Sequence, residues 1–282
     1  MTHRPIDEDQ GLETTAPPKV EAGRALRLVA RYDAMRLETY RNKEQLFGRI
    51  CVSPIGHALG LRFDDVGYFN RVYCDDLSFV EELAAIEEFY RGGRFGCEVV
   101  GPPTGVAQSV RLARAGWSAG QEYAWLHHAN CGALRLGDGM QFTIRPPKAS
   151  EQHEFLQAYL CAFEAQRENI PGALRNMKHL FDRPELNFLM AWQGNRLAGI
   201  AMWMRCGEAA LLCAGAALPE FRELGCHAAL LGARIRMAAE AGCKEIYSWA
   251  ALGGQSQSNM ERAGLRVVGT TKTWRYRAEE GR

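Results

Sequence analysis

Hydrophobic and polar positions recur with recognisable periods in the second half of the chain. Short apolar runs at residues 211–214 and 245–250 predict buried strands. Between them lies an alanine-rich amphipathic helix that ends at Ala241, with Gly242 as a C-terminal cap. Residues 255–263 predict another helix. The apolar stripe that the longer helix turns toward the sheet consists of Leu230, Leu231, Ile235, Met237 and Ala238.

The rest of the chain predicts a similar order of strands and helices in both halves. In the first half, a helix from residue 25 towards residue 47 precedes β-like residues 50–63, a strand at 66–74, a helix at 79–90, a strand at 97–100, a helix at 106–115 and a strand at 121–127. The second half starts with a strand at 142–145, helices at 151–166 and 170–181, and a hairpin of 187–192 and 197–205. This order indicates an α/β fold with a mixed sheet, built from two tandem repeats.

The expected domain boundaries follow from composition. Residues 1–22 are proline-containing and polar, which predicts a disordered leader. Residues 23–128 form the first repeat, residues 129–141 a linker without clear periodicity, and residues 142–282 the second domain. The basic side chains of the first helix indicate a solvated face: Arg24, Arg27, Arg31, Arg36, Arg41 and Lys43.

Composition narrows the class of protein. Lys and Arg number 34 against 33 Asp and Glu, a net charge of +1, which argues against a nucleic-acid partner because such binders show a basic excess. The 9 cysteines are scattered without C-x-x-C spacing, so we expect reduced thiols, no structural metal site and a cytoplasmic location. There is no signal-peptide h-region and no apolar run of membrane-spanning length. We therefore expect a soluble monomer or homodimer without a membrane partner.

The loop before the longer helix is the strongest candidate for a binding site. Gly225 stands where the chain turns from a strand into the helix, whose first backbone amides have no partner within the helix. Such a terminus attracts anions, and glycine allows a close backbone approach. Strand-to-helix turns also use glycine merely to turn, so the loop alone leaves a purely structural role open.

The residues around this loop resemble a known family. The string Leu218-Pro219-Glu220-Phe221-Arg222-Glu223-Leu224-Gly225 is similar to the Arg/Gln-x-x-Gly-x-Gly/Ala pyrophosphate loop of the Gcn5-related N-acetyltransferase superfamily. The tail Asn259-Met260-Glu261-Arg262-Ala263-Gly264-Leu265 resembles the end of that fold's last helix. The resemblance covers roughly residues 142–277. It implies an acetyltransferase-type fold in both repeats, with acetyl-CoA or another acyl-CoA as cosubstrate.

The resemblance also implies roles for particular residues. Arg222, Gly225, Cys226, His227 and Ala228 would face the coenzyme phosphates, and Gly215 and Ala217 would offer main-chain contacts to the pantetheine arm. In the resembled fold, the segment between the first two helices closes over the acceptor. Here residues 164–169 are polar, which favours a polar acceptor.

Three positions depart from the family pattern. His227 stands where the motif has glycine or alanine, and its imidazole offers a donor to phosphate. Met260 replaces the tyrosine that protonates the leaving thiolate in many members, and a thioether has no proton to give. Cys213 lies near the position where many members of the family have an Asp or Glu that acts as general base. We interpret Cys213 either as a small buried core residue or as a nucleophile that becomes acylated. Tyr247 is the candidate substitute for the missing acid, with ordinary strand packing as the alternative.

The first repeat lacks such a loop. Its corresponding residues 73–79 contain Asp75 and Asp76, which repel an anion. We expect a degenerate repeat that walls one side of the substrate cleft or shields the sheet. The leading hypothesis is N-acyl transfer, most simply N-acetyl transfer, to a small polar amine. The alternatives are aminoacyl transfer from charged tRNA and a non-catalytic acyl-CoA sensor or partner-binding module.

Overall fold

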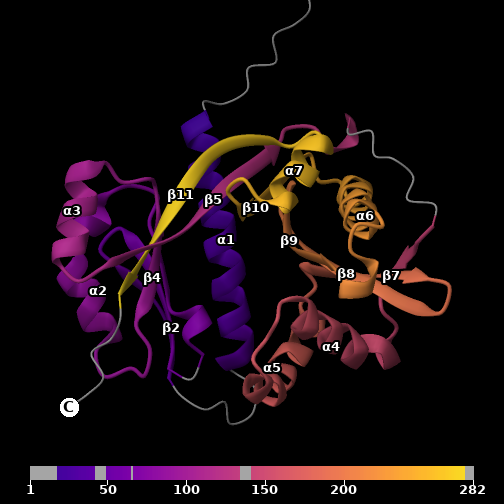
Figure 1. The fold of residues 1–282 in the computed structure, drawn as a ribbon, viewed down its shortest axis with the longest axis horizontal. Coiled ribbons are helices and arrows are strands. Elements are labelled where there is room, and N and C mark those ends of the chain that lie inside the picture. Colours follow the sequence, from indigo (N-terminus) through magenta and orange to yellow (C-terminus); the bar gives the residue numbers. More distant parts are fainter. Residues whose placement is uncertain (1–17, 42–48, 65, 134–140, 277–282) are drawn as a thin grey trace, which may run out of the picture.

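The computed structural model describes residues 18–41, 49–64, 66–133 and 141–276, and within them the chain forms a mixed sheet with helices on both faces (Figure 1). The strands are β1 (Ile50–Ile55), β2 (Ala58–Phe63), β3 (Arg71–Tyr73), β4 (Cys97–Gly101), β5 (Ser118–His128), β6 (Thr143–Arg145), β7 (Leu186–Gln193), β8 (Arg196–Cys206), β9 (Ala209–Ala217), β10 (Glu245–Ala251) and β11 (Arg266–Tyr276). The α-helices are α1 (Pro18–Arg41), α2 (Leu83–Tyr90), α3 (Val106–Arg114), α4 (Gln152–Ala162), α5 (Ile170–Met177), α6 (Cys226–Glu240) and α7 (Gln255–Arg262).

The two halves exchange their last strands. The sheet order is β1-β2-β3-β4-β11-β5-β10-β9-β8-β7-β6, so β11 of the second half lies between β4 and β5 of the first. In turn, β5 pairs antiparallel with β10 of the second half, and β5 and β11 run side by side across the molecule (Figure 1). Neither half completes its sheet alone. The boundary expected at residues 129–141 separates two stretches of sequence but not two sheets, and residues 134–140 lie outside the described residues.

The alternation of side chains along each strand divides the core into two layers. On β5, Trp125 packs into one cluster, whereas Ala124 and Leu126 pack into another on the opposite face. Tyr247 and Ile246 on β10 divide in the same way. Because successive side chains of a strand point to opposite faces, the inserted strands serve both layers.

Helices cover the two faces in different ways. On one face, α1, α4 and α5 share a single apolar cluster with strands of both halves. On the other face, α6 and α7 pack on the second half and α2 and α3 on the first. Helix α1 therefore belongs to the first half in sequence but contacts β9 and β10 of the second.

Helix α1 corrects two expectations. The leader expected for residues 1–22 lies outside the described residues up to residue 17, and residues 18–22 are helical instead. The basic positions are not all solvated, because Arg36 is 4% exposed. Its guanidinium pairs with Asp33 and lies over the rings of Tyr32 and Phe69. A basic residue on a helix can thus belong to a buried polar cluster.

Candidate functional site

An opening between β9 and β10 is the central feature of the site. The two parallel strands pair only at Glu245 with Ala209, Ile246 with Ala210 and Tyr247 with Leu211. Both strands then continue, β9 to residue 217 and β10 to residue 251, without further pairing to each other. Along this stretch the facing edges of β9 and β10 are consequently not satisfied by each other and need other partners.

A bulge in β9 lies at the inner end of this opening. Ala214 pairs with Met202, whereas the next pair joins Leu211 to Met204, so β9 carries one more residue than β8 at this point. Both Cys213 and Ala214 consequently pack on the face of α1. A bulge re-aims backbone groups, and bulges are common at functional sites.

The helix that follows β9 begins beside the opening. Gly225 has φ of 81°, a left-handed conformation that favours glycine, and its carbonyl accepts the N–H of Ala229 at 3.0 Å. That bond is the first of the helix, so the amides of Cys226, His227 and Ala228 have no acceptor within α6. These amides make the start of α6 suited to an anion, as the sequence predicts.

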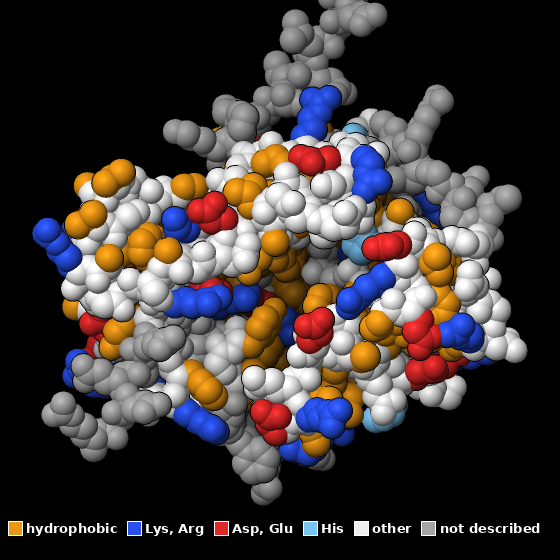
Figure 2. Space-filling model, viewed as in Figure 1, with side chains coloured by type: hydrophobic (Ala, Val, Ile, Leu, Met, Phe, Trp, Pro, Cys, Tyr) orange, Lys and Arg blue, Asp and Glu red, His pale blue; other side chains and the backbone are white. Residues whose placement is uncertain are grey.

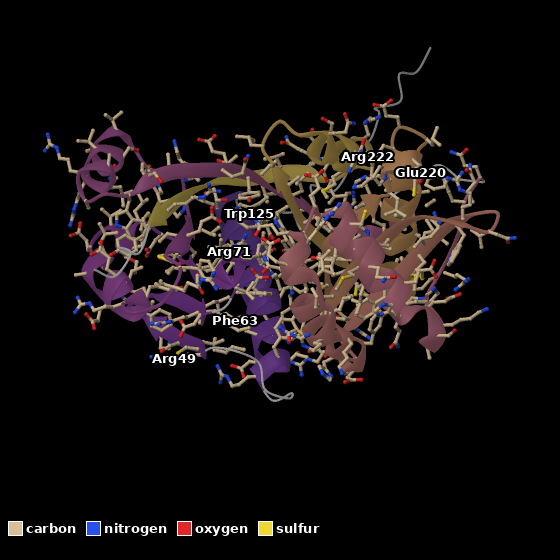
Figure 3. All side chains as sticks on the ribbon, turned by 60° about the horizontal axis from the view of Figure 1, so that its bottom comes forward. Arg49, Phe63, Arg71, Trp125, Glu220 and Arg222 are labelled. Atoms are coloured by element: carbon tan, nitrogen blue, oxygen red, sulfur yellow. The ribbon has the colours of Figure 1, made fainter. Side chains whose placement is uncertain are left out.

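The loop residues differ in exposure. Arg222, Gly225 and Ala228 are exposed, and Arg222 lies with Glu220 at the start of α6, well apart from Arg71 in the first half (Figure 3). Glu220 pairs with Arg196, and no carboxylate of the described residues forms an ion pair with Arg222. The side chain of Gln141 donates to the Leu224 carbonyl and so ties the loop to the start of the second half.

Cys226 and His227 have lost contact with bulk water to different degrees. The Cys226 side chain is 1% exposed in the apolar cluster beneath α6, and burial raises the pKa of its thiol to about 12. Only its backbone amide is thus available to a ligand. The His227 ring is partly buried and lies 3.1 Å from the Asn259 side chain on α7. Burial, and then the charge of Arg234, lower the pKa of His227 to about 4, so the imidazole is neutral near pH 7.

Side chains satisfy two backbone carbonyls in the opening. Ser248 Oγ of β10 donates to the Leu212 carbonyl at 3.2 Å, and Arg234 Nη1 of α6 donates to the Ala214 carbonyl at 2.8 Å. Gly215 is next to this guanidinium and is partly buried, as is Ala217. The two predicted arm-binding positions thus border the opening.

Tyr247 faces away from the opening. It is fully buried, its hydroxyl donates to the Glu21 carboxylate, and its ring stacks on His127 at 4.6 Å between centroids. Burial, and then this hydrogen bond, raise the pKa of Tyr247 well above its usual value. The arrangement is that of a packed aromatic residue, the alternative interpretation of the sequence, rather than of a proton donor in the opening.

The other positions that depart from the family pattern are also packed. Met260 is 4% exposed in the cluster between α6, α7 and the sheet. Burial raises the pKa of the Cys213 thiol well above its usual value, which leaves no thiolate for acylation near pH 7. Neither residue supplies an acid, a base or an activated nucleophile.

The first half has the same strand–helix–strand unit but no opening. β3 and β4 pair along their length, and Cys74 extends the ladder by donating to the Val100 carbonyl. The buried Phe79 ring fills the space beyond, 3.2 Å from where a Cβ on Gly101 would lie. The residue that precedes helix α2 is Glu82, an acid rather than a glycine. These features agree with the expected degenerate repeat.

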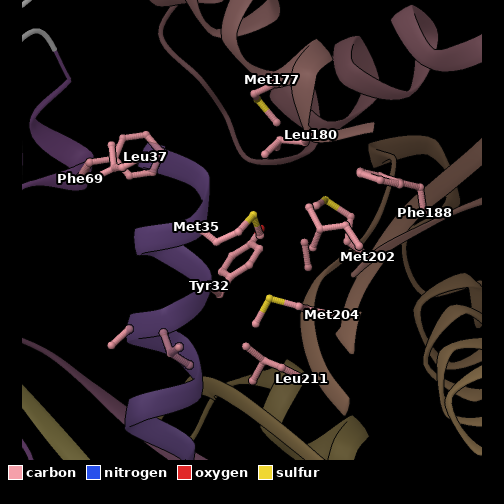
Figure 4. Close-up of a cluster of buried hydrophobic side chains, with 14 of the residues drawn as sticks. Tyr32, Met35, Leu37, Phe69, Met177, Leu180, Phe188, Met202, Met204 and Leu211 are labelled. Atoms are coloured by element: carbon pink, nitrogen blue, oxygen red, sulfur yellow. The ribbon is translucent and has the colours of Figure 1, made fainter. Parts of the chain in front are cut away.

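A hollow lies beside α1, on the face of the sheet that this helix covers (Figure 2). Figure 2 shows a central depression lined by hydrophobic side chains, in the position between α1 and β9 in Figure 1. Tyr32 and Met35 of α1 face Met202, Met204 and Leu211 (Figure 4). All five side chains are buried, so this wall is packed core that joins α1 to the sheet of the second half.

A polar cluster lies on α1 beside this wall. Asp33, 2% exposed, accepts hydrogen bonds from Tyr73 OH at 2.5 Å and from Nη1 of both Arg36 and Arg71 at 3.3 Å. Arg36 Nε and Tyr40 OH are buried without a hydrogen-bond partner among the described residues. Asp33 and Arg36 also act electrostatically on the Cys213 thiol, which relates the cluster to the bulge of β9.

Reasoning from the sequence missed Arg234, Ser248 and the Asp33 cluster. Arg234 had a usable signal, because it occupies an apolar-stripe position of α6, four residues after Leu230 and four before Ala238. A charged residue in such a stripe needs an explanation. The Asp33 cluster gave no comparable signal, since its members lie far apart in the sequence.

Solved structures of known proteins share this architecture. No protein-family model and no curated protein matches the sequence. A GCN5-related N-acetyltransferase from Kribbella flavida matches with a TM-score of 0.61 at 16% identity, over 89% of this chain and 96% of that one. Another, from Sphaerobacter thermophilus, matches with a TM-score of 0.57 at 15% identity, over 93% of this chain and 94% of that one. The chain has the GCN5-related N-acetyltransferase (GNAT) fold.

The tandem form of the GNAT fold is also represented. A tandem GNAT protein from the clavulanic acid biosynthesis pathway matches with a TM-score of 0.51 at 12% identity, over 71% of this chain and 69% of that one. The mixed α/β fold with tandem repeats predicted from the sequence is therefore confirmed. At identities this low, the structural likeness establishes the GNAT fold and does not establish the reaction.

Two features are absent from the described residues. None of their helices is long and apolar enough to span a bilayer. Nor do these residues include a cluster of three or more His, Cys, Asp or Glu side chains placed to hold a metal ion.

Proposed function

We propose that the protein is an acyl-CoA-dependent N-acyltransferase that acts on a small polar amine. The observation that carries the proposal is the coincidence of two features. The strands β9 and β10 open after Tyr247 and Leu211, and the free amides at the start of α6 lie beside that opening. An anion site beside an unpaired strand edge fits a ligand with a diphosphate and an extended amide-containing arm, which is the chemistry of coenzyme A.

The coenzyme phosphates bind at the start of α6. The amides of Cys226, His227 and Ala228 donate to them, Gly225 allows close approach, and Arg222 adds a positive charge. The neutral His227 adds a hydrogen-bond donor through the ring nitrogen that does not face Asn259. The arm runs along β9 past Ala217 and Gly215 toward the bulge.

The amine approaches from the hollow beside α1. Its nitrogen attacks the thioester carbonyl, the C–N bond forms, and the C–S bond breaks to release the coenzyme thiol with the proton that the amine loses. Backbone amides of β9 near the bulge stabilise the oxyanion, and holding both reactants in line supplies much of the rate. The polar Asp33 cluster, in which Arg36 Nε and Tyr40 OH are buried without a hydrogen-bond partner among the described residues, favours an acceptor with a polar group.

A second candidate is a non-catalytic acyl-CoA sensor. It is favoured by the absence, among the described residues at the opening, of an evident proton donor, since Met260 and Tyr247 are both packed. Aminoacyl transfer from tRNA has no comparable support, because the charge of the chain is nearly balanced at +1.

A thiol-release assay with acetyl-CoA against pooled small amines tests the proposal. Release that depends on one pool supports an N-acyltransferase and begins to identify the acceptor. Saturable coenzyme binding without release in any pool, repeated with longer acyl-CoA donors, supports the sensor. Absence of coenzyme binding contradicts both functions.

A further inference from the structure

Arg234 is a buried positive charge without a negative partner. Its side chain is 1% exposed, Nη1 donates to the Ala214 carbonyl at 2.8 Å, and Nε donates to the Leu230 carbonyl at 3.4 Å. Nη2 is buried and has no hydrogen-bond partner among the described residues. No carboxylate of those residues forms an ion pair with it. A buried charge without a partner is strongly destabilising, so a specific role is expected.

The guanidinium lies against β9 at the gap that begins beyond the last pair of β9 with β10. A Cβ on Gly215 would lie 2.6 Å from Nη2 and 2.9 Å from Cζ, so this strand position must be glycine for Arg234 to occupy the gap. The Ala214 carbonyl, beyond the last pair with β10, accepts its hydrogen bond from Arg234 instead of from a strand. The unpartnered Nη2 therefore lies against the stretch of β9, at Gly215 beside the bulge, along which the proposed function places the donor.

Position along α6 excludes the coenzyme phosphates as the partner of Arg234. Nine residues separate it from Gly225, which corresponds to about 13 Å along the helix axis. The phosphates lie at the loop, whereas Arg234 lies beside Gly215 and the bulge at Cys213 and Ala214. The end of the arm and the acyl group are the parts of the donor that reach this depth in the proposed binding mode.

The protonation state of the Arg234 guanidinium fits an anionic partner. Burial lowers the pKa of Arg234 to about 10, so the guanidinium is still protonated near pH 7. A neutral thioester carbonyl would accept a hydrogen bond from Nη2 but would not compensate the charge. A carboxylate does both, and a guanidinium binds it with favourable geometry.

We propose that Arg234 binds a carboxylate on the acyl group, so that the acyl donor is a dicarboxylic acyl-CoA rather than acetyl-CoA. This inference rests on the proposed N-acyltransferase function. The amine nitrogen attacks the thioester carbon, the C–S bond breaks, and the amine proton ends on the released thiol. The remote carboxylate keeps its charge and its bond to Arg234 throughout and is carried into the amide product.

Calorimetric titrations with succinyl-CoA, butyryl-CoA and free CoA test the inference. The first two have acyl chains of equal carbon number and differ in the carboxylate. We expect the wild-type protein to bind succinyl-CoA at least about tenfold more tightly than butyryl-CoA. Arg234→Met should abolish this preference and change the affinity for free CoA less than about twofold. Arg236→Met, which removes an exposed arginine of the same helix, is the matched control and should keep the preference.

Each result has a distinct meaning. Equal affinities of the wild-type protein for succinyl-CoA and butyryl-CoA overturn the inference and leave the proposed function intact. No binding of any coenzyme overturns the proposed function itself. A preference that persists in Arg234→Met assigns the carboxylate to another residue and also overturns the inference. Because the wild-type comparison needs no variant, a failure of Arg234→Met to fold does not prevent the test.

Discussion

The Tyr247 hydroxyl donates a hydrogen bond to the Glu21 carboxylate and so ties strand β10 to the first turn of α1, 226 residues away in the sequence. Arg24 strengthens the junction, since it lies over the Tyr247 ring and pairs with Glu245 at 2.6 Å. The contact fixes a helix of the first half on the sheet of the second. It also removes Tyr247 from the opening where a catalytic acid would have to act.

Replacing Tyr247 therefore tests a structural role against a catalytic one. We expect Tyr247→Phe to lower the free energy of unfolding by about 2 kcal/mol, because the buried Glu21 carboxylate loses a donor. Urea unfolding measures this loss. Turnover and coenzyme affinity should stay within about twofold of wild type. Tyr123→Phe, on the adjacent strand β5, is the control. A drop in kcat of about a hundredfold with unchanged stability would instead make Tyr247 a catalytic acid.

Arg71 provides a test of the acceptor side. It pairs with Asp33 at 3.3 Å and lies over the Tyr68 ring, beside the hollow. If the acceptor binds there, Arg71→Met should raise the acceptor KM about tenfold, since a hydrogen bond to a charged group is worth about 1.5–3 kcal/mol. Coenzyme affinity should not change.

The matched control for Arg71 is Arg275→Met. Both arginines pair with Glu98, but the Arg275 side chain is 60% exposed, whereas that of Arg71 is 15% exposed. Steady-state kinetics with the acceptor found by the thiol-release screen make the comparison. An equal effect of the two substitutions on KM would place the acceptor elsewhere.

His227 predicts a pH dependence of stability. Its pKa in the folded protein is about 4, against 6.5 for the unperturbed side chain. The unfolded state therefore binds a proton below about pH 6.5 that the folded state does not bind until about pH 4, so the free energy of unfolding falls as the pH is lowered between these values. The contribution of His227 is at most about 3 kcal/mol, from 1.36 kcal/mol per pKa unit.

Urea unfolding at several pH values measures this dependence. His227→Gln, which retains a hydrogen-bonding partner for Asn259, should have a flatter profile than wild type between pH 6.5 and pH 4. Identical slopes for the two proteins would show that His227 does not carry the shift. Above pH 6.5 the two profiles should run parallel.

The sequence predicted most elements but not how they pair. The strands at residues 209–217 and 245–251 and the helix between them follow from local periodicity, and the pattern indicated the repeat. No element was assigned after Gly264, although β11 is rich in Val and Thr, residues typical of strands. The exchange of β5 and β11 could not be predicted from the sequence, because the alternation of side chains along a strand shows which residues share a face and not which strand lies next to it.

The features of the site also divide into those that adjacent residues encode and those that depend on contacts between distant segments. Gly225 and its loop are local, since a left-handed glycine before a helix is encoded by adjacent residues. The Asp33 cluster, the filled gap at Phe79 and the junction of Tyr247 with Glu21 depend on contacts between distant segments. Arg234 lies between these cases, because its place in the apolar stripe is visible in the sequence but its partner Gly215 is not.

The most direct test of the central claim is a calorimetric titration of the wild-type protein, Ala228→Glu and Ala228→Gln with coenzyme A. Ala228 is exposed in the first turn of α6, where a glutamate is favourable for the helix but places a negative charge against the expected phosphates. We predict saturable binding to wild type and to Ala228→Gln, and at least about tenfold weaker binding to Ala228→Glu with undiminished thermal stability. Equal binding to all three proteins, or no binding to wild type, would contradict a coenzyme site at the start of α6.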